Sequence, residues 1–132
     1  MSLEIKIVNA TIDIFREKGV KFTMDDLANR LGVSKRTLYE NIDSKETLLN
    51  LLVDEVFDSV TEKGKEVIND DSIGDLEKLK RVLTILPTSY DTIDYTKIHE
   101  VKKFYPKIYE KIIYRLDLTW EQTDELVKKC IN

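Results

Sequence analysis

A run of polar side chains near position 40 has the residue types that contact nucleic acids. Residues 35–41 include one strongly apolar side chain, Leu38, which we expect to be buried, so that the others cover the outer face. Guanidinium, ammonium, hydroxyl, carboxylate and amide groups hydrogen-bond to base edges and to phosphate oxygens. These types predict binding to double-stranded DNA. The candidate contacting residues are Lys35, Arg36, Thr37, Tyr39, Glu40 and Asn41.

The chain offers few residues for catalysis or for metal binding. His99 is its one histidine and Cys130 its one cysteine, which excludes an intrachain disulfide, a thiolate zinc cluster and a two-histidine metal site. A catalytic triad that uses His99 remains open, but the sequence has neither a glycine-rich phosphate loop nor an H-E-x-x-H motif. We therefore expect no enzymatic activity, no cofactor and no metal, and both residues to be ordinary helix residues.

Two short helices are expected to position the polar segment. The first spans residues 24–31, with Thr23 as its N-cap and Asp26 completing a capping box. Gly32 lets the chain turn sharply into the second helix, residues 35–41. This spacing is typical of a helix-turn-helix. Helix N-termini attract phosphate oxygens. The expected N-caps around this surface are Thr23, Ser34 and Ser44.

The remaining sequence also predicts helices. With 4 Gly and 2 Pro in 132 residues, the chain has too few turn residues for a sandwich or a barrel. Residues 69–74 read as the clearest loop, Pro87 as the end of a helix, residues 88–94 as a loop or ragged turn, and Thr119 with Gln122 as the start of the last helix. We therefore predict an all-α fold, in which a three-helix helix-turn-helix domain (residues 1–45) is joined by a long fourth helix to a helical regulatory domain (residues 46–132). The expected helices span residues 4–18, 24–31, 35–41, 45–68, 76–86, 95–104, 106–116 and 119–130.

Charge and hydropathy limit which partners and which cellular location the sequence predicts. The formal net charge is −4, and the whole acidic excess lies after residue 50, so DNA binding would use a small local patch. No apolar run approaches the roughly 18 residues that a membrane span needs. The first residues lack the basic-then-apolar pattern of a signal peptide. We expect a cytoplasmic protein with no membrane partner.

The first half of the chain resembles a known family. The segments KIVNATIDIFREKG and FTMDDLANRLGVSKRTLYENIDSKETLL are similar, in order and spacing, to the DNA-binding domain of the tetracycline-repressor (TetR) family over about residues 5–60. The resemblance implies a homodimeric repressor on a palindromic DNA operator, released by a small-molecule effector that binds a variable helical C-terminal domain. Family members usually run longer and dimerise through two late helices, so we expect the usual four-helix interface to be incomplete in a chain of this length.

The resemblance also implies roles for individual residues. Thr23 opens the second helix, where the family contacts phosphate, and both Tyr39 and Lys45 match phosphate-contacting positions of the family. Asn41 stands where the family often has histidine, beside the variable Glu40. The residues at the start of the recognition helix, where the family touches bases and backbone, are Ser34, Lys35, Arg36 and Thr37.

Aromatic residues gather in the C-terminal half, and three interpretations stay open. They form a helical core with surface tyrosines, they line an effector pocket, or they form an exposed patch for further helices. The resemblance favours the pocket. For the whole protein, the alternative to a DNA-binding regulator is a helical protein-interaction module that retains the helix-turn-helix without using it for DNA. The aromatic residues concerned are Tyr90, Tyr95, Phe104, Tyr105, Tyr109, Tyr114 and Trp120.

Overall fold

The computed structural model describes residues 2–90 and 95–131, with side chains described for residues 2–85 and 96–131. Within these ranges the chain forms α-helices and one short 3-10 turn, η1 (Gly19–Lys21), and it contains no strand. The all-α prediction is therefore confirmed. The helices are α1 (Leu3–Lys18), α2 (Met24–Leu31), α3 (Lys35–Asn41), α4 (Lys45–Ile68), α5 (Asp75–Tyr90), α6 (Tyr95–Phe104) and α7 (Pro106–Ile131).

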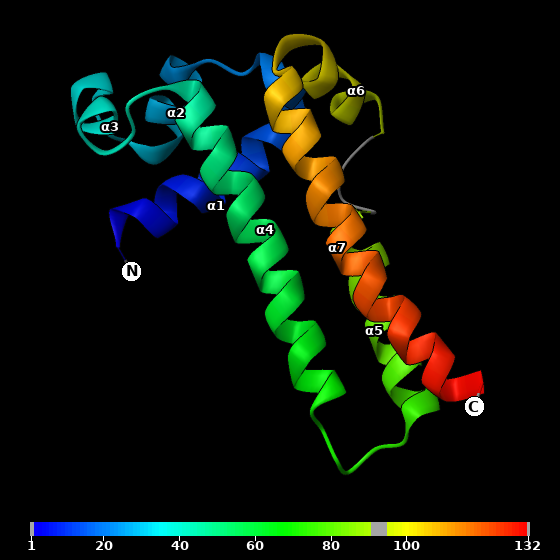
Figure 1. Cartoon of the computed structure of the whole chain (residues 1–132). Coiled ribbons are helices and arrows are strands. Elements are labelled where there is room, and N and C mark those ends of the chain that lie inside the picture. Colours follow the sequence, from blue (N-terminus) through cyan, green and yellow to red (C-terminus); the bar gives the residue numbers. More distant parts are fainter. Residues whose placement is uncertain (1, 91–94, 132) are drawn as a thin grey trace.

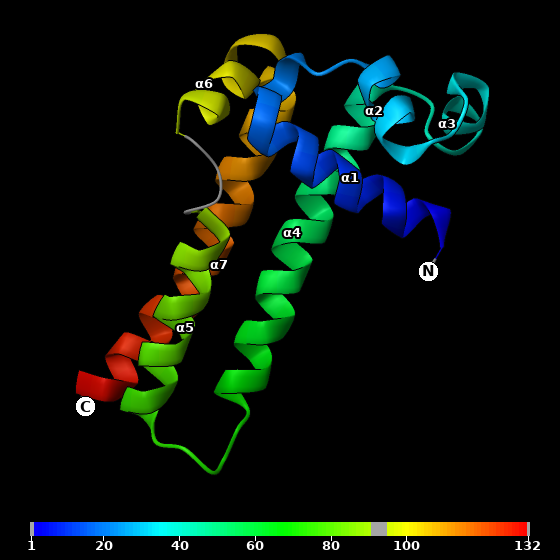
Figure 2. The same ribbon diagram turned by 180° about the vertical axis from the view of Figure 1, so that it is seen from behind.

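The helices form a head and a stem. Helices α1, α2 and α3 make the head, and α4 leads away from it beside α5 and α7 (Figures 1 and 2). Helix α6 lies at the head end of the stem and contacts η1. Because α4 has 24 residues, it extends about 36 Å and joins the helix-turn-helix to the far end of the stem. No described helix is long and apolar enough to cross a membrane.

The main core lies under the head. Phe22, Leu27, Leu38 and Leu48 are each fully buried, and the cluster that contains them continues through the first turns of α4 to Ile108 of α7. Burying side chains of this size is worth about 1.5–3 kcal/mol each. The recognition elements are thus fixed to the rest of the molecule by apolar packing.

Local signals in the sequence set the helix boundaries of the head. Gly19 ends α1 at φ +68, and Gly32 ends α2 at φ +70, a left-handed conformation that favours glycine. Ser34 caps α3 and Ser44 caps α4, each accepting a hydrogen bond from a backbone N–H three residues later. The predicted bounds of α2, α3 and α4 are confirmed.

The predicted break before Thr119 is wrong, because α7 is continuous from Pro106 to Ile131. The hydroxyl of Thr119 donates to the carbonyl oxygen of Arg115, 2.9 Å away, instead of capping a new helix. Threonine tolerates this bond within a helix. Buried Thr123 and Leu126 continue the packed face of α7 beyond this point.

Helix α5 also differs from its prediction, since it runs through Pro87 to Tyr90. Proline removes one backbone N–H donor but has a φ angle close to that of a helix. The helix therefore continues for another turn after losing one hydrogen bond. Of the predicted loop, residues 88–90 are helical and residues 91–94 lie outside the described residues.

Candidate nucleic-acid interface

Reciprocal hydrogen bonds fix the start of α2. The Thr23 hydroxyl oxygen accepts from the Asp26 N–H at 3.0 Å, and an Asp26 carboxylate oxygen accepts from the Thr23 N–H at 3.0 Å. These bonds lower the pKa of Asp26, since the Thr23 N–H stabilises the ionised carboxylate. The predicted capping box is confirmed, and it places the exposed Thr23 at the N-terminus of α2.

The turn and the cap of α3 determine which side chains face outward. The Val33 N–H donates to the Ala28 carbonyl oxygen at 3.1 Å, which closes the end of α2. Ser34 accepts from the Thr37 N–H at 3.1 Å and pairs with the Thr37 hydroxyl at 3.0 Å. Because Leu38 is fully buried, the opposite side of α3 points to solvent.

The structure brings the predicted contacting residues of α3 together on one exposed surface. Tyr39 is 44% exposed, and Thr37 is half-buried with its hydroxyl bonded to Ser34. Asn41 is exposed and donates from its amide nitrogen to the Thr37 carbonyl oxygen at 2.8 Å. Their contact with DNA stays a prediction, but their placement fits it. The exposed members of the set are Lys35, Arg36, Tyr39, Glu40 and Asn41.

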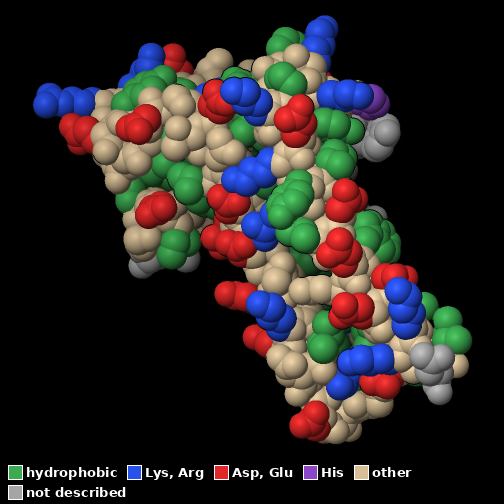
Figure 3. All heavy atoms as spheres, in the orientation of Figure 1, with side chains coloured by type: hydrophobic (Ala, Val, Ile, Leu, Met, Phe, Trp, Pro, Cys, Tyr) green, Lys and Arg blue, Asp and Glu red, His purple; other side chains and the backbone are tan. Residues whose placement is uncertain are grey.

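Acidic partners accompany the two cations of this surface. Lys35 Nζ lies 3.2 Å from an Asp25 carboxylate oxygen of α2, and Arg36 Nε lies 3.2 Å from Glu40 Oε1. Figure 3 shows basic and acidic side chains next to each other over the head, instead of a broad basic field. Phosphates must therefore compete with intramolecular carboxylates, which reduces electrostatic, sequence-independent binding.

Lys45 is bonded to the protein at the head end of α4. Its ammonium donates to the carbonyl oxygens of Val20 and Phe22. Burial lowers the pKa of Lys45, because desolvation disfavours the charged form. An ammonium has three N–H donors, so one remains for a phosphate oxygen. No sequence pattern indicates these bonds to residues 19–22, the connector between α1 and α2.

The aromatic side chains that the structure describes in the C-terminal half do not converge on one hollow. Phe104, Tyr114 and Trp120 are 49%, 63% and 53% exposed. Tyr105 and Tyr109 are half-buried and pack against the main core. The side chains of Tyr90 and Tyr95, also predicted to bind a ligand, lie outside the described residues.

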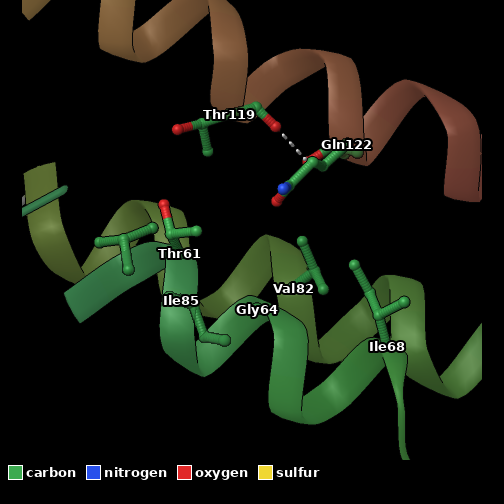
Figure 4. Close-up of a pocket in the computed structure, with 9 residues that line it drawn as sticks. Thr61, Gly64, Ile68, Val82, Ile85, Thr119 and Gln122 are labelled. Carbon is green, nitrogen blue, oxygen red and sulfur yellow. Dashed lines mark hydrogen bonds between the residues drawn. The ribbon is translucent and has the colours of Figure 1, made fainter. Parts of the chain in front are cut away.

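A small hollow lies instead between α4, α5 and α7 (Figure 4). Its volume is about 10 Å³, enough for about one water molecule. Gly64 is buried at its α4 side, and a Cβ atom added there would meet no other atom within 4 Å. This site was not predicted from the sequence, although a glycine within the helical pattern of residues 45–68 is a signal that could have indicated it. The lining residues are Val60, Thr61, Gly64, Ile68, Val82, Ile85, Thr119, Gln122 and Thr123.

A second hollow of about 260 Å³ lies between α1 and α4 on the side of the head. Carboxylates of Glu4, Asp54, Glu55 and Asp58 line it. Among the described residues, no group of histidine, cysteine and carboxylate side chains is arranged to hold a metal ion.

The first half of the chain matches a family of known proteins. The family described as "Bacterial regulatory proteins, tetR family" matches residues 7–52, which include α2 and α3. The uncharacterized HTH-type transcriptional regulator YvaF of Bacillus subtilis (strain 168) is 28% identical over 128 residues, which make up 97% of this chain and 67% of YvaF.

Solved structures share the fold over nearly the whole chain. The TetR family transcriptional regulator PfmR from Thermus thermophilus aligns with a TM-score of 0.73 and 22% identity, covering 95% of this chain and 70% of PfmR. The ketosteroid transcriptional regulator KstR2 of Mycobacterium tuberculosis aligns with a TM-score of 0.74 and 16% identity, covering 96% of this chain and 67% of KstR2. The stem thus shares its helical arrangement with these regulators.

Proposed function

Because the chain belongs to the tetR family of bacterial regulatory proteins, whose members regulate transcription by binding DNA, we propose that it is a sequence-specific repressor released from its operator by a small-molecule effector. One observation carries the DNA-binding part of the proposal. Leu38 is fully buried, and the polar residues of α3 therefore cover its solvent face. A helix presented in this way fits the major groove, which admits one α-helix.

The operator is proposed to be a palindrome read by a homodimer. One seven-residue recognition helix contacts few base pairs, so a single copy would bind weakly. Two copies related by a two-fold axis read half-sites one helical turn apart, about 34–36 Å. The exposed Thr23 and Tyr39, with the remaining N–H of Lys45, are proposed to contact phosphates beside each half-site.

The effector is proposed to enter between α4, α5 and α7. The hollow there is mainly apolar, with Thr61 and Gln122 among its few hydrogen-bonding groups, which suits a largely apolar molecule with one or two polar atoms. Since about 10 Å³ holds no such molecule, binding must separate these helices. Because α4 begins beside α3, its displacement would change the spacing of the two recognition helices.

DNA binding is tested by a mobility-shift titration against the DNA that flanks the protein's own gene, with the solution mass measured in parallel. Replacing Lys35, Arg36 and Tyr39 by alanine should weaken binding by about 100-fold or more, because each loses a base or phosphate contact. A matched control replaces Lys128, Arg81 and Tyr114, which are exposed residues of the same types on the stem. Equal binding by the recognition-helix variant and the wild type would favour the protein-interaction module.

Effector release needs a separate measurement. A small-molecule panel is screened for compounds that raise the thermal midpoint of the protein, and each is then added to the operator complex at saturation. The proposal expects a compound that lowers operator affinity, because an effector must bind the two conformations with different affinities. A compound that occupies the stem at saturation without changing operator affinity would contradict it.

A further inference from the structure

Arg36 and Glu40 form the outermost edge of the recognition helix. Each is two residues from the fully buried Leu38, which is about 200° around an α-helix and therefore on the opposite side. The side chain of Arg36 is 90% exposed and that of Glu40 is 59% exposed. In a helix that enters the major groove, these two side chains reach the base edges first.

Their ion pair decides which part of the guanidinium is left for DNA. Arg36 Nε donates to Glu40 Oε1 at 3.2 Å across one helical turn. Among the described residues, the structure gives the two Nη atoms of Arg36 no partner. Glu40 thus occupies the Nε edge of the guanidinium. The far end, which carries the two Nη atoms, offers two parallel N–H donors to DNA.

This arrangement matches one base pair. In the major groove, guanine presents two acceptors, O6 and N7, and its paired cytosine presents the N4 amino donor beside them. Two Nη donors of Arg36 fit O6 and N7, while the Glu40 carboxylate accepts from N4. We propose that the Arg36–Glu40 pair acts as a unit that reads a single G·C base pair in each half-site, an inference that rests on the proposed DNA-binding function.

The same pair disfavours an A·T pair. Adenine places an N6 amino donor where guanine has O6, so it opposes the Arg36 donors. Thymine places its O4 acceptor where cytosine has its amino group, so it repels the Glu40 carboxylate. Discrimination therefore comes from unfavourable contacts with the wrong pair as well as from favourable contacts with the right one.

The test is selection of binding sites from a random duplex DNA pool, with wild-type protein and two variants of Arg36. The wild-type consensus should contain a G·C pair. Arg36→Ala should lower the preference for G·C at that position by about 10-fold and leave the preferences at the other positions unchanged. Arg36→Lys keeps the charge but cannot form the parallel pair of bonds, so it should weaken the same preference while keeping general DNA affinity.

Two further variants distinguish base recognition by the Arg36–Glu40 pair from a general effect of charge on DNA affinity. Glu40→Gln should reduce discrimination against A·T at that position only, because an amide, unlike a carboxylate, can donate to thymine O4. Arg81→Ala is the matched control, since Arg81 Nε pairs with Glu77 Oε1 at 3.2 Å, also four residues apart, on α5. It should leave the consensus unchanged.

The outcomes are distinguishable. If both Arg36 variants keep the wild-type consensus, recognition of a G·C base pair by the Arg36–Glu40 pair is overturned. The proposed DNA-binding function would still stand. Uniform loss of affinity in Arg36→Lys, with no change at any one position, would assign Arg36 to phosphate and also overturn recognition of the base pair. If wild-type protein enriches no sequence while its far-ultraviolet circular dichroism shows folded helix, the proposed function fails and recognition of the base pair fails with it.

Discussion

The ammonium of Lys45 lies 4.2 Å from the centre of the Phe22 ring and donates a hydrogen bond to the Phe22 carbonyl oxygen. Phe22 is fully buried, and it ends the connector that leads into α2. This pair therefore links the first turn of α4 to the start of the helix-turn-helix. We therefore expect a movement of α4 at this end to shift the connector, because a charged hydrogen bond and a cation–π contact hold the two together.

Replacing Lys45 by methionine is expected to have two effects. Stability should fall by about 1–3 kcal/mol, because two part-buried carbonyl oxygens lose their donor while the apolar stem of the side chain is kept. Operator affinity should fall for all sequences, and the slope of log affinity against log salt should flatten by about one, through loss of a phosphate contact.

Urea denaturation and a salt titration of DNA binding measure these two effects separately. A loss of stability with an unchanged salt slope would mean that Lys45 only holds the connector. A loss of affinity confined to one operator base would also contradict the phosphate contact.

Two glycine-to-alanine substitutions should change the stability of the protein in opposite directions. Gly64→Ala is expected to stabilise the protein by about 0.5–1 kcal/mol, because alanine favours helix and the added Cβ enters open space in the stem hollow. Gly32→Ala should destabilise it by about 1 kcal/mol or more, since Gly32 has φ +70 and an alanine there is strained although nothing lies within 4 Å. Thermal unfolding of both variants measures the difference.

Gly64→Ala also probes the proposed effector site. A methyl group at this position reduces the space between α4, α5 and α7. A compound that releases the wild-type protein from DNA should therefore bind Gly64→Ala more weakly, while operator affinity without the compound stays the same. Unchanged response to the compound would place the effector elsewhere in the molecule.

The head was largely predictable from the sequence, because its determinants are local. The cap at Ser34, the glycine at position 32 and the capping box at Thr23 and Asp26 each act within four residues and appear directly in the residue order. The burial of Leu38 follows from the apolar pattern of the same segment. The candidate DNA surface could thus be assigned residue by residue.

The stem was less predictable, because its determinants are distant in sequence. Thr119 is a frequent N-cap type, yet packing of α7 against α4 and α5 keeps that helix continuous through it. The pairing of Arg115 with Asp58 joins residues 57 positions apart and has no local signature. Aromatic residues in α6 and α7 are common in cores and on surfaces alike, so their sequence pattern does not determine a pocket.

The capping box predicts a dependence of stability on pH. The pKa of Asp26 is lowered, chiefly by the Thr23 N–H, so its folded-state pKa is below the unfolded value of about 3.9. The ionised carboxylate therefore stabilises the fold above about pH 5, and this contribution is lost as the pH falls through the folded-state pKa. Asp26→Asn should lower stability at pH 7, and the difference from wild type should shrink toward zero near pH 2.

Denaturation curves of both proteins between pH 2 and pH 7 measure this difference. Asp43→Asn serves as the control, because Asp43 is an exposed carboxylate between α3 and α4. A gap between Asp26→Asn and wild type that stays constant over the whole range would show that ionisation of Asp26 contributes nothing.

Charged residues of α7 join it to α4 along the stem. Lys111 Nζ lies 2.9 Å from an Asp54 carboxylate oxygen, and an Arg115 nitrogen lies 2.7 Å from an Asp58 carboxylate oxygen. Arg115 is only 21% exposed and its guanidinium lies 5.6 Å from the centre of the Phe57 ring, so its contacts are less screened than those of a surface pair.

Replacing Arg115 by methionine should therefore destabilise the protein by about 1–2 kcal/mol, against about 0.5 kcal/mol or less for Arg81→Met, which breaks an exposed pair within α5. A double-mutant cycle with Asp58→Asn isolates the energy of the pair from the loss of packing. If this pair helps to hold α4 in the DNA-binding position, Arg115→Met should also weaken operator binding although it lies far from α3. Equal effects of Arg115→Met and Arg81→Met on both stability and operator affinity would show that the ion pairs of Arg115 with α4 contribute no more than the exposed pair within α5.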